Sequence, residues 1–273
     1  MSTSIDTVFQ TQWESEVFTA YQRQGSLLRG AVREKTITPG DTAKFPKYGT
    51  GSVGARGKHG LVPVMNASHT IVSVTVSDYY GGEYIDDLDE LKTDIDERGQ
   101  AAKALALAAG RKVDERIIAA IEGVSGVTTI AHGSVGFTKT KLLSLVEKFH
   151  AANVPEDGQK FCALAPQGWT QLLDLAEVKS RDYMTTMPWM DGYRMLDFMG
   201  IKFMMHTGLN ITSTTRNALA WHRPAVGLAW VADLRSNFDW IAERAAYFAQ
   251  VRISCEAVGI DGASAFIVQC TET

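Results

Sequence analysis

Residues 94–122 read DIDERGQAAKALALAAGRKVDERIIAAIE and carry the strongest helix signal of the chain. Thr93 is placed to cap this helix, Asp96 completes the capping spacing, and Gly123 supplies a stop. Apolar residues recur at helical spacing and predict one buried face: Ile95, Ala102, Leu105, Ala109, Val113, Ile117 and Ile121. At 1.5 Å per residue the helix is about 43 Å long, which is long for a globular protein. Such a helix must lie along a broad body or form the spine of an elongated domain.

The segments around the helix mix strand and helix patterns. Two further helices are predicted, over 138–152 and 166–177. Strand patterns occur on both sides of the long helix, at 69–80, 161–165, 195–207 (a strand pair), 218–230 (an apolar stretch), 249–256 and 263–270. The last two are joined by residues with turn glycines. The fold class is therefore α+β, and a hydrophobic content of 45% is enough for a large core.

Residues 37–70 have a composition of their own. Two short extended runs, 43–48 and 60–65, flank a glycine-rich stretch in which Val53 is the one sizeable apolar residue. We expect a long two-stranded loop that projects from the body and contributes nothing to a core. The stretch Gly49–Gly54 matches the dinucleotide pattern G-x-G-x-x-G, but the residues after it cannot begin a helix. Because a pyrophosphate needs that helix N-terminus, a loop tip is favoured over a nucleotide site.

Composition and motifs exclude several classes of function. The chain has 27 basic and 31 acidic residues, and a net charge of −4 does not fit a protein that coats nucleic acid. The stretch 101–110 is the longest of low polarity and is too short to span a bilayer. We predict that the protein is not an enzyme and has no catalytic residue, cofactor or metal, because its six histidines and three cysteines lack ligand spacing and no nucleophile motif occurs. We expect the cysteines to be buried free thiols: Cys162, Cys255 and Cys270.

The first residues predict a surface for a second copy of the chain. Phe9, Trp13, Val17 and Tyr21 recur every four residues, which places four large apolar groups on one helical face. A helix near a chain end has little body of its own to cover such a face. We therefore predict that these four residues contact another subunit.

Charge is distributed unevenly along the chain. Residues 29–60 contain seven basic and two acidic residues, whereas residues 78–97 contain nine acidic residues and one basic residue. The two segments would be complementary where they met between copies. The predicted contact residues are Lys44, Lys47, Arg56 and Lys58 on the basic side and Asp86, Asp87, Asp89 and Glu90 on the acidic side. Ordinary solvated charge stays open as the alternative. A cation site at the acidic cluster is disfavoured because the spacing of a calcium loop is absent.

The order of these elements resembles the Hong Kong 97 fold of tailed-phage major capsid proteins. Five phrases are similar to that family as well, at residues 18–29, 86–98, 110–118, 165–169 and 220–229. The resemblance covers nearly the whole chain and implies four parts. They are an N-terminal arm (1–36), an extended loop (37–68), a peripheral domain with the long spine helix (69–125 and 238–273) and an axial domain (126–237).

The resemblance also implies a function. The protein would assemble as pentamers and hexamers into the icosahedral head that encloses phage double-stranded DNA, without sequence-specific contacts to it. It would belong to the virion capsid, be made in the cytoplasm of the host bacterium and have no membrane partner. A portal, a separate scaffolding protein and a decoration protein are the implied partners. The alternatives are an encapsulin-like nanocompartment shell and, from another class, a soluble nucleotide-binding enzyme that uses the Gly49–Gly54 loop.

Overall fold

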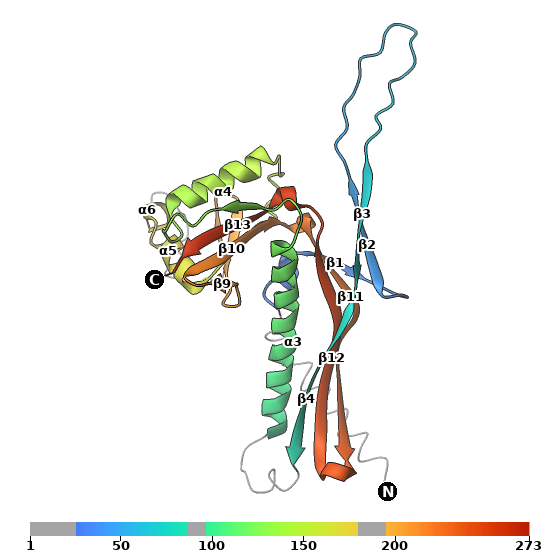
Figure 1. Cartoon of the computed structure of the whole chain (residues 1–273), viewed down its shortest axis with the longest axis vertical. Helices are drawn as coiled ribbons and strands as arrows, with labels where there is room; N and C mark the ends of the chain where they lie inside the picture. Colours follow the sequence, from blue (N-terminus) through green and yellow to red (C-terminus); the bar gives the residue numbers. More distant parts are fainter. Residues whose placement is uncertain (1–25, 87–96, 180–194, 273) are drawn as a thin grey trace.

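The computed structural model describes residues 26–86, 97–179 and 195–272. Three β-sheets and one long helix make up most of this part of the chain. Figure 1 shows an elongated arrangement in which a four-stranded sheet and the long helix run side by side. A seven-stranded sheet with its helices lies at one end of the long helix, and a two-stranded hairpin extends away from the body.

The long helix α3 runs from Glu97 to Glu122, so 26 residues give a length of about 39 Å. Thr93, Ile95 and Asp96 lie outside the described residues. The predicted inward face within the helix is confirmed, since all six of its described positions are buried: Ala102, Leu105, Ala109, Val113, Ile117 and Ile121. Gly123 follows the last helical residue, and its N–H donates to Ala119 O at 2.9 Å.

The four-stranded sheet packs one face against α3. Its strand order is β1 (Arg33–Thr36), β11 (Val226–Ile241), β12 (Ala246–Gly259) and β4 (Ser77–Asp86). β1 is parallel to β11, and the other neighbours are antiparallel. Between helix and sheet lies a core that includes Leu105, Phe238 and Val251.

The seven-stranded sheet has α4 (Lys139–Ala151), α5 (Pro166–Leu173) and α6 (Ala176–Lys179) beside it. Its strand order is β5 (Thr128–Ile130), β13 (Ala265–Thr271), β10 (Thr215–His222), β6 (Lys160–Leu164), β8 (Ile201–Met205) and β7 (Met195–Phe198), with β9 (Ile211–Thr212) paired to β10. Leu142 and Phe149 of α4 pack into this core with Phe203 and Phe266. The predicted helix 138–152, strand 161–165 and strand pair 195–207 are confirmed. The predicted helix 166–177 is interrupted between α5 and α6.

Two predictions about strands are wrong, one about a pairing partner and one about the length of a strand. The run 60–65 is not a strand: β2 (Thr42–Tyr48) pairs instead with β3 (His69–Thr75). The single strand predicted over 69–80 is divided at Val76, whose N–H donates to Asp41 O at 2.8 Å. This bond marks the point where the chain leaves the hairpin and enters β4 in the four-stranded sheet.

The chain passes from one sheet to another at residues that differ from the domain boundaries that the resemblance implies. Residues 226–237 belong to the four-stranded sheet, and β13 belongs to the seven-stranded sheet. Thus β12 and β13 are consecutive strands of different sheets. Their connection crosses at Gly262, where an added Cβ would lie 2.2 Å from Ser125 O. The chain can pass this close to Ser125 because the residue has no side chain.

A buried carboxylate joins the root of the N-terminal arm to the long helix. Asp114 of α3 accepts hydrogen bonds from Ser26 Oγ and from the backbone N–H groups of Leu27 and Leu28, both at 3.2 Å. His206 Nε2 lies 3.1 Å from the same carboxylate, while His206 Nδ1 accepts from Gly208 N–H at 3.1 Å. His206 therefore uses Nε2–H as the donor to Asp114. The end of β8, the helix and the arm root meet at this one side chain.

The three cysteines are free and buried, as predicted. Burial raises the pKa of the Cys162 thiol above its ordinary range, that of Cys255 to about 12 and that of Cys270 to about 11. All three are therefore protonated and unreactive at neutral pH.

Replacement of Asp114 tests how much its carboxylate contributes to stability. We expect Asp114→Ala to lower the free energy of unfolding of the unassembled chain by about 3 kcal/mol, because the buried Leu28 N–H and the buried His206 lose their acceptor. Urea unfolding followed by tryptophan fluorescence measures the change. The matched control is Glu115→Ala, which removes an exposed carboxylate from the adjacent position. Equal effects of the two substitutions would contradict the assignment.

Candidate subunit interface

The hairpin β2–β3 carries a long tip that stands away from the body. Beyond the ladder, residues 49–68 form the projecting loop, which Figure 1 shows extending past both sheets. Its backbone bonds include Gly49 N–H to Ser68 O at 2.7 Å and Gly60 N–H to Gly57 O at 2.9 Å. Its apolar side chains are almost fully exposed, at 94% for Val53, 95% for Leu61 and 81% for Val64. A subunit contact is the ordinary way to cover such side chains.

The root of the hairpin, in contrast, is firmly packed. Phe45 is fully buried and lies with Ala43, Ile37, Ala229 and Ile260 in a small core. The expectation that this segment contributes nothing to a core is therefore wrong. The Phe45 ring sits on Gly227, where an added Cβ would lie 2.7 Å from it. The close approach is possible because position 227 has no side chain, and it holds the base of the projecting loop against β11.

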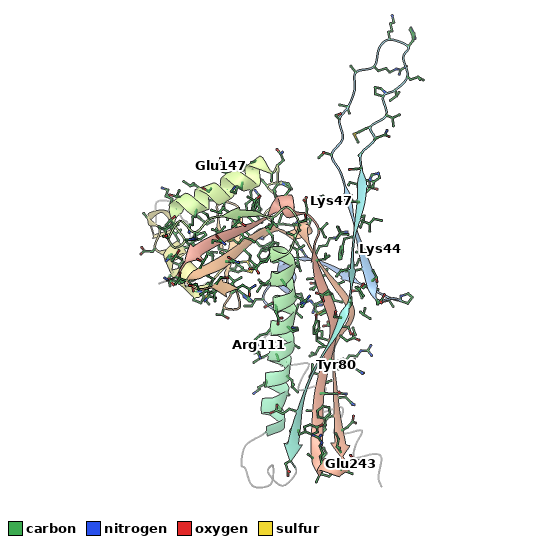
Figure 2. All side chains as sticks on the ribbon, in the orientation of Figure 1. Lys44, Lys47, Tyr80, Arg111, Glu147 and Glu243 are labelled. Carbon is green, nitrogen blue, oxygen red and sulfur yellow. The ribbon has the colours of Figure 1, made fainter. Side chains whose placement is uncertain are left out.

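The four basic residues predicted for the interface lie in different surroundings. Lys44 and Lys47 lie on the hairpin (Figure 2), and Lys44 is exposed on β2. Lys47 Nζ donates to Asp261 Oδ1 at 2.8 Å within the same chain. Arg56 Nε donates to Gly60 O and so closes the tip of the projecting loop. Lys58 is exposed at that tip. Lys44, Arg56 and Lys58 are thus exposed to solvent in the single subunit. Lys47 instead forms an ion pair that fixes the hairpin to the body.

Asp86, the one predicted acidic residue that the structure describes, lies at the other end of the molecule. Asp86 is exposed at the end of β4, opposite Ala246. Glu83 and Glu243 are exposed at the same end of the four-stranded sheet, and Figure 2 shows Glu243 at the far tip from Lys44 and Lys47. Asp87, Asp89 and Glu90 lie outside the described residues, as do Phe9, Trp13, Val17 and Tyr21. One chain does not bring its basic loop and acidic end together, so contact between them requires two copies.

A groove that the sequence did not reveal lies between α3 and the sheet. It has a volume of about 430 Å³ and is lined by residues of three elements: Asp78, Tyr79, Tyr80 and Gly81 of β4, Val251 and Ile253 of β12, and Leu105, Ala108, Ala109 and Lys112 of α3. Nearby, Glu256 accepts from Arg116 Nε at 2.7 Å and from Tyr79 Oη at 3.1 Å. The hydrogen bond to Glu256 raises the pKa of Arg116, while burial and the Glu256 charge raise that of Tyr79. Both therefore keep their protons at neutral pH and hold the helix to β12 and β4.

The geometry offers little to a nucleotide or a metal ion. The Gly49–Gly54 stretch is extended and leads into the rest of the projecting loop, so it provides no helix N-terminus for a pyrophosphate. Among the described residues, no three His, Cys, Asp or Glu side chains are grouped so that they could hold a metal ion. No helix in the described ranges is long and apolar enough to cross a bilayer.

The decisive observation comes from comparison with known families. Residues 5–272 match the model of the family described as phage capsid protein. The chain belongs to the phage capsid protein family. The capsid protein therefore acts as a structural subunit that assembles with copies of itself into the shell of a virion.

Solved structures show the same fold. The capsid of cyanophage P-SCSP1u superposes with a TM-score of 0.70 at 20% identity, over 92% of this chain and 89% of that one. A structure from Mycobacterium phage Che8 gives 0.64 at 13% identity, over 89% of this chain and 90% of that one. A virus-like particle from Pyrococcus furiosus gives 0.64 at 12% identity, over 95% and 99%. A search of curated protein sequences gave no match. The predicted Hong Kong 97 fold and the major capsid function are thus confirmed.

Loosening the packed root of the hairpin tests how the capsid protein holds its loop. Phe45→Ala leaves a cavity against Gly227, and we expect the β2–β3 amides to exchange faster by a factor on the order of 100. Hydrogen exchange of the unassembled chain, followed by mass spectrometry, measures this. The control is Tyr48→Ala, because Tyr48 is exposed on the same strand. Unchanged protection in Phe45→Ala would show that the root is held in another way.

Proposed function

We propose that this capsid protein assembles as pentamers and hexamers into an icosahedral head that encloses phage double-stranded DNA. The observation that carries the proposal is the projecting loop, whose apolar side chains have no cover within the described chain. Burial of these side chains on neighbouring subunits releases about 25 cal/mol per Å² and is repeated at every subunit of a closed shell. The family match favours this function over a nanocompartment shell.

Charge provides the second contribution to assembly. The exposed Arg56 and Lys58 at the loop tip of one copy face the acidic end of another, near Asp86 and the segment that holds Asp87, Asp89 and Glu90. The two groups lie at opposite ends of one subunit, as Figure 1 shows for the loop and the end of β4. This arrangement orients neighbours head to tail, and a head-to-tail contact that closes generates a ring.

The proposed division into parts follows the sheets and not the boundaries that the resemblance implies. We assign α3 and the four-stranded sheet to the peripheral domain and the seven-stranded sheet to the axial domain at the capsomer centre. Residues 37–68 then form the extended loop. Residues 1–36 form the arm, which joins the peripheral domain through β1 and whose Phe9, Trp13, Val17 and Tyr21 contact a second subunit. A protein of net charge −4 offers the packed DNA no overall electrostatic attraction, and we propose no sequence-specific contact with it. A portal, a separate scaffolding protein and a decoration protein complete the head, which is made in the host bacterial cytoplasm.

Reversal of charge at the loop tip tests the electrostatic contact. Arg56→Glu/Lys58→Glu should lower the yield of particles in low salt, and the difference should shrink in high salt because exposed charges are screened. Sedimentation and negative-stain microscopy of the expressed chain measure the yield. The charge-matched control reverses two exposed residues of α3, Lys103→Glu/Arg111→Glu. Equal losses in both variants would point to net charge alone.

Truncation of apolar side chains tests the arm. The expressed full chain should form particles visible by microscopy, whereas Phe9→Ala/Trp13→Ala/Tyr21→Ala should stay a soluble, folded subunit. The reason is that the variant loses three large apolar groups from the proposed contact face, each worth about 2 kcal/mol when buried. Circular dichroism confirms that the variant is folded. Normal particles from the variant would remove the arm from the interface, and a full chain that forms neither regular nor aberrant particles would contradict the proposed function.

A further inference from the structure

The face of the four-stranded sheet that points away from α3 carries two arginines side by side. Arg235 of β11 lies directly opposite Arg252 of β12, and both are exposed. Their chain neighbours Leu234, Val251 and Ile253 pack in cores formed with α3. Because successive side chains of a strand alternate between its faces, the two arginines project from the other face.

This pairing is unfavourable in the isolated subunit, since like charges directly opposite each other in an antiparallel ladder repel. Among the described residues, neither guanidinium has a hydrogen-bond or ion-pair partner. The closest carboxylates along β11 and β4 are hydrogen-bonded to other groups, Asp233 to Arg29 and Asp78 to Ser254. An anion from outside the subunit would balance the two charges.

Irregularities in the ladder put the arginines opposite each other. The register between β11 and β12 shifts twice between Trp230 and Arg235. A regular ladder continued from Trp230 would set Asp233 opposite Arg252 and form an ion pair across the strands. The bulges set Arg235 there instead. Because bulges re-aim side chains and are frequent beside functional sites, this arrangement points to a binding surface.

The neighbouring positions of this face add aromatic and polar groups. Tyr80 of β4 lies opposite Arg252 and is 68% exposed, and Figure 2 shows it on the sheet. The next row of the ladder contains Asn237, Gln250 and Gly82. Arginine, tyrosine, asparagine and glutamine are side chains that contact the phosphates and sugars of nucleic acids. The surface thus has the composition of a contact for a nucleic-acid backbone.

We propose that Arg235 and Arg252 bind phosphate groups of the packaged double-stranded DNA, so that this face of the sheet lines the interior of the shell. The inference rests on the proposed function, which supplies the DNA, and goes further in naming the residues and the face that meet it. A guanidinium group matches two oxygens of a phosphate. Contacts to the DNA backbone carry no sequence information, so the contact is independent of the DNA sequence.

DNA suits the pair better than a carboxylate of a neighbouring copy does. Duplex DNA carries one negative charge for about every 1.7 Å of its axis, so adjacent guanidinium groups can each meet a phosphate. A single carboxylate would balance only one of the two charges. The net charge of −4 keeps the contact weak, because the attraction is confined to this surface.

Binding to a short DNA duplex tests the proposal. The unassembled full chain is titrated into a fluorescein-labelled duplex at low salt, and the fluorescence anisotropy is measured. We expect Arg235→Gln/Arg252→Gln to weaken binding about tenfold and to reduce the slope of log affinity against log salt by about 2, as for two lost phosphate contacts. Failure of the natural chain to bind the duplex would overturn the inference.

The matched control is Lys103→Gln/Arg111→Gln, which removes two exposed positive charges from α3. It should bind the duplex nearly as tightly as the natural chain. Equal weakening in both variants would show that only net charge matters and would overturn the inference. Since binding is measured on free subunits, these failures leave the proposed function standing. A natural chain that binds DNA through this pair but forms no particles, regular or aberrant, would contradict the proposed function instead.

Competing polyanions distinguish a phosphate ligand from a carboxylate ligand. Polyphosphate should displace the natural chain from the duplex at about a tenth of the charge concentration that polyglutamate requires, because the guanidinium fork favours phosphate oxygens. Polyglutamate that competes equally well would assign the pair to a carboxylate of another copy and overturn the inference.

The stability of the free subunit gives a second measurement. Arg252→Gln removes the repulsion and keeps much of the side chain, so it should raise the urea concentration at the midpoint of unfolding. Tryptophan fluorescence follows the transition. A lower midpoint would show that Arg252 is bound within its own subunit and would overturn the inference.

Discussion

The apolar stripe of α3 is the interaction on which the other parts of the capsid protein depend. Val113, Ile117 and Ile121 lie in one continuous core with Leu228 and Ile253 of the four-stranded sheet and with Leu219 and Ile267 of the seven-stranded sheet. One helix therefore fixes both sheets relative to each other. The root of the arm is attached to the same helix through Asp114, and the hairpin is attached to β11 through Phe45 and Gly227. The candidate surfaces for other subunits are thus held by one buried framework.

Patterns that are local in the sequence predicted local structure well. The helix face from Ala102 to Ile121 follows from a 3.6-residue period, and each member is in fact buried. The partners of strands could not be predicted in this way. The run 60–65 has strand-forming residues, yet the ladder of β2 forms with β3 because the bond from Val76 to Asp41 closes the hairpin at its root. The close approaches at Gly227 and Gly262 also depend on residues distant in the chain.

The sequence predicted which types of residue make up the candidate interface, but it did not predict the contacts that these residues make. Exposed basic residues at the loop tip and an acidic end of β4 follow from the uneven charge of the sequence. The sequence could not show that Lys47 is bound to Asp261, which is distant in the chain and comes near only in the folded molecule. The sequence contains an apolar run from Leu61 to Met65 after the glycine-rich stretch, and this run predicts a strand of the hairpin. In the structure it is not a strand. The groove was beyond prediction because three separate elements line it.

The scarcity of backbone bonds in the projecting loop affects how a shell grows. In the free subunit, few backbone hydrogen bonds hold the residues between Gly49 and Ser68, and fixing a residue that is free to move costs about 1–2 kcal/mol of conformational entropy. This cost offsets much of the gain from apolar burial, so a single loop contact is weak and readily broken. A subunit that has joined at a wrong angle can then leave before others surround it. Only when several neighbours hold the same subunit does its residence time become long, and errors are removed at the growing rim while the closed shell persists.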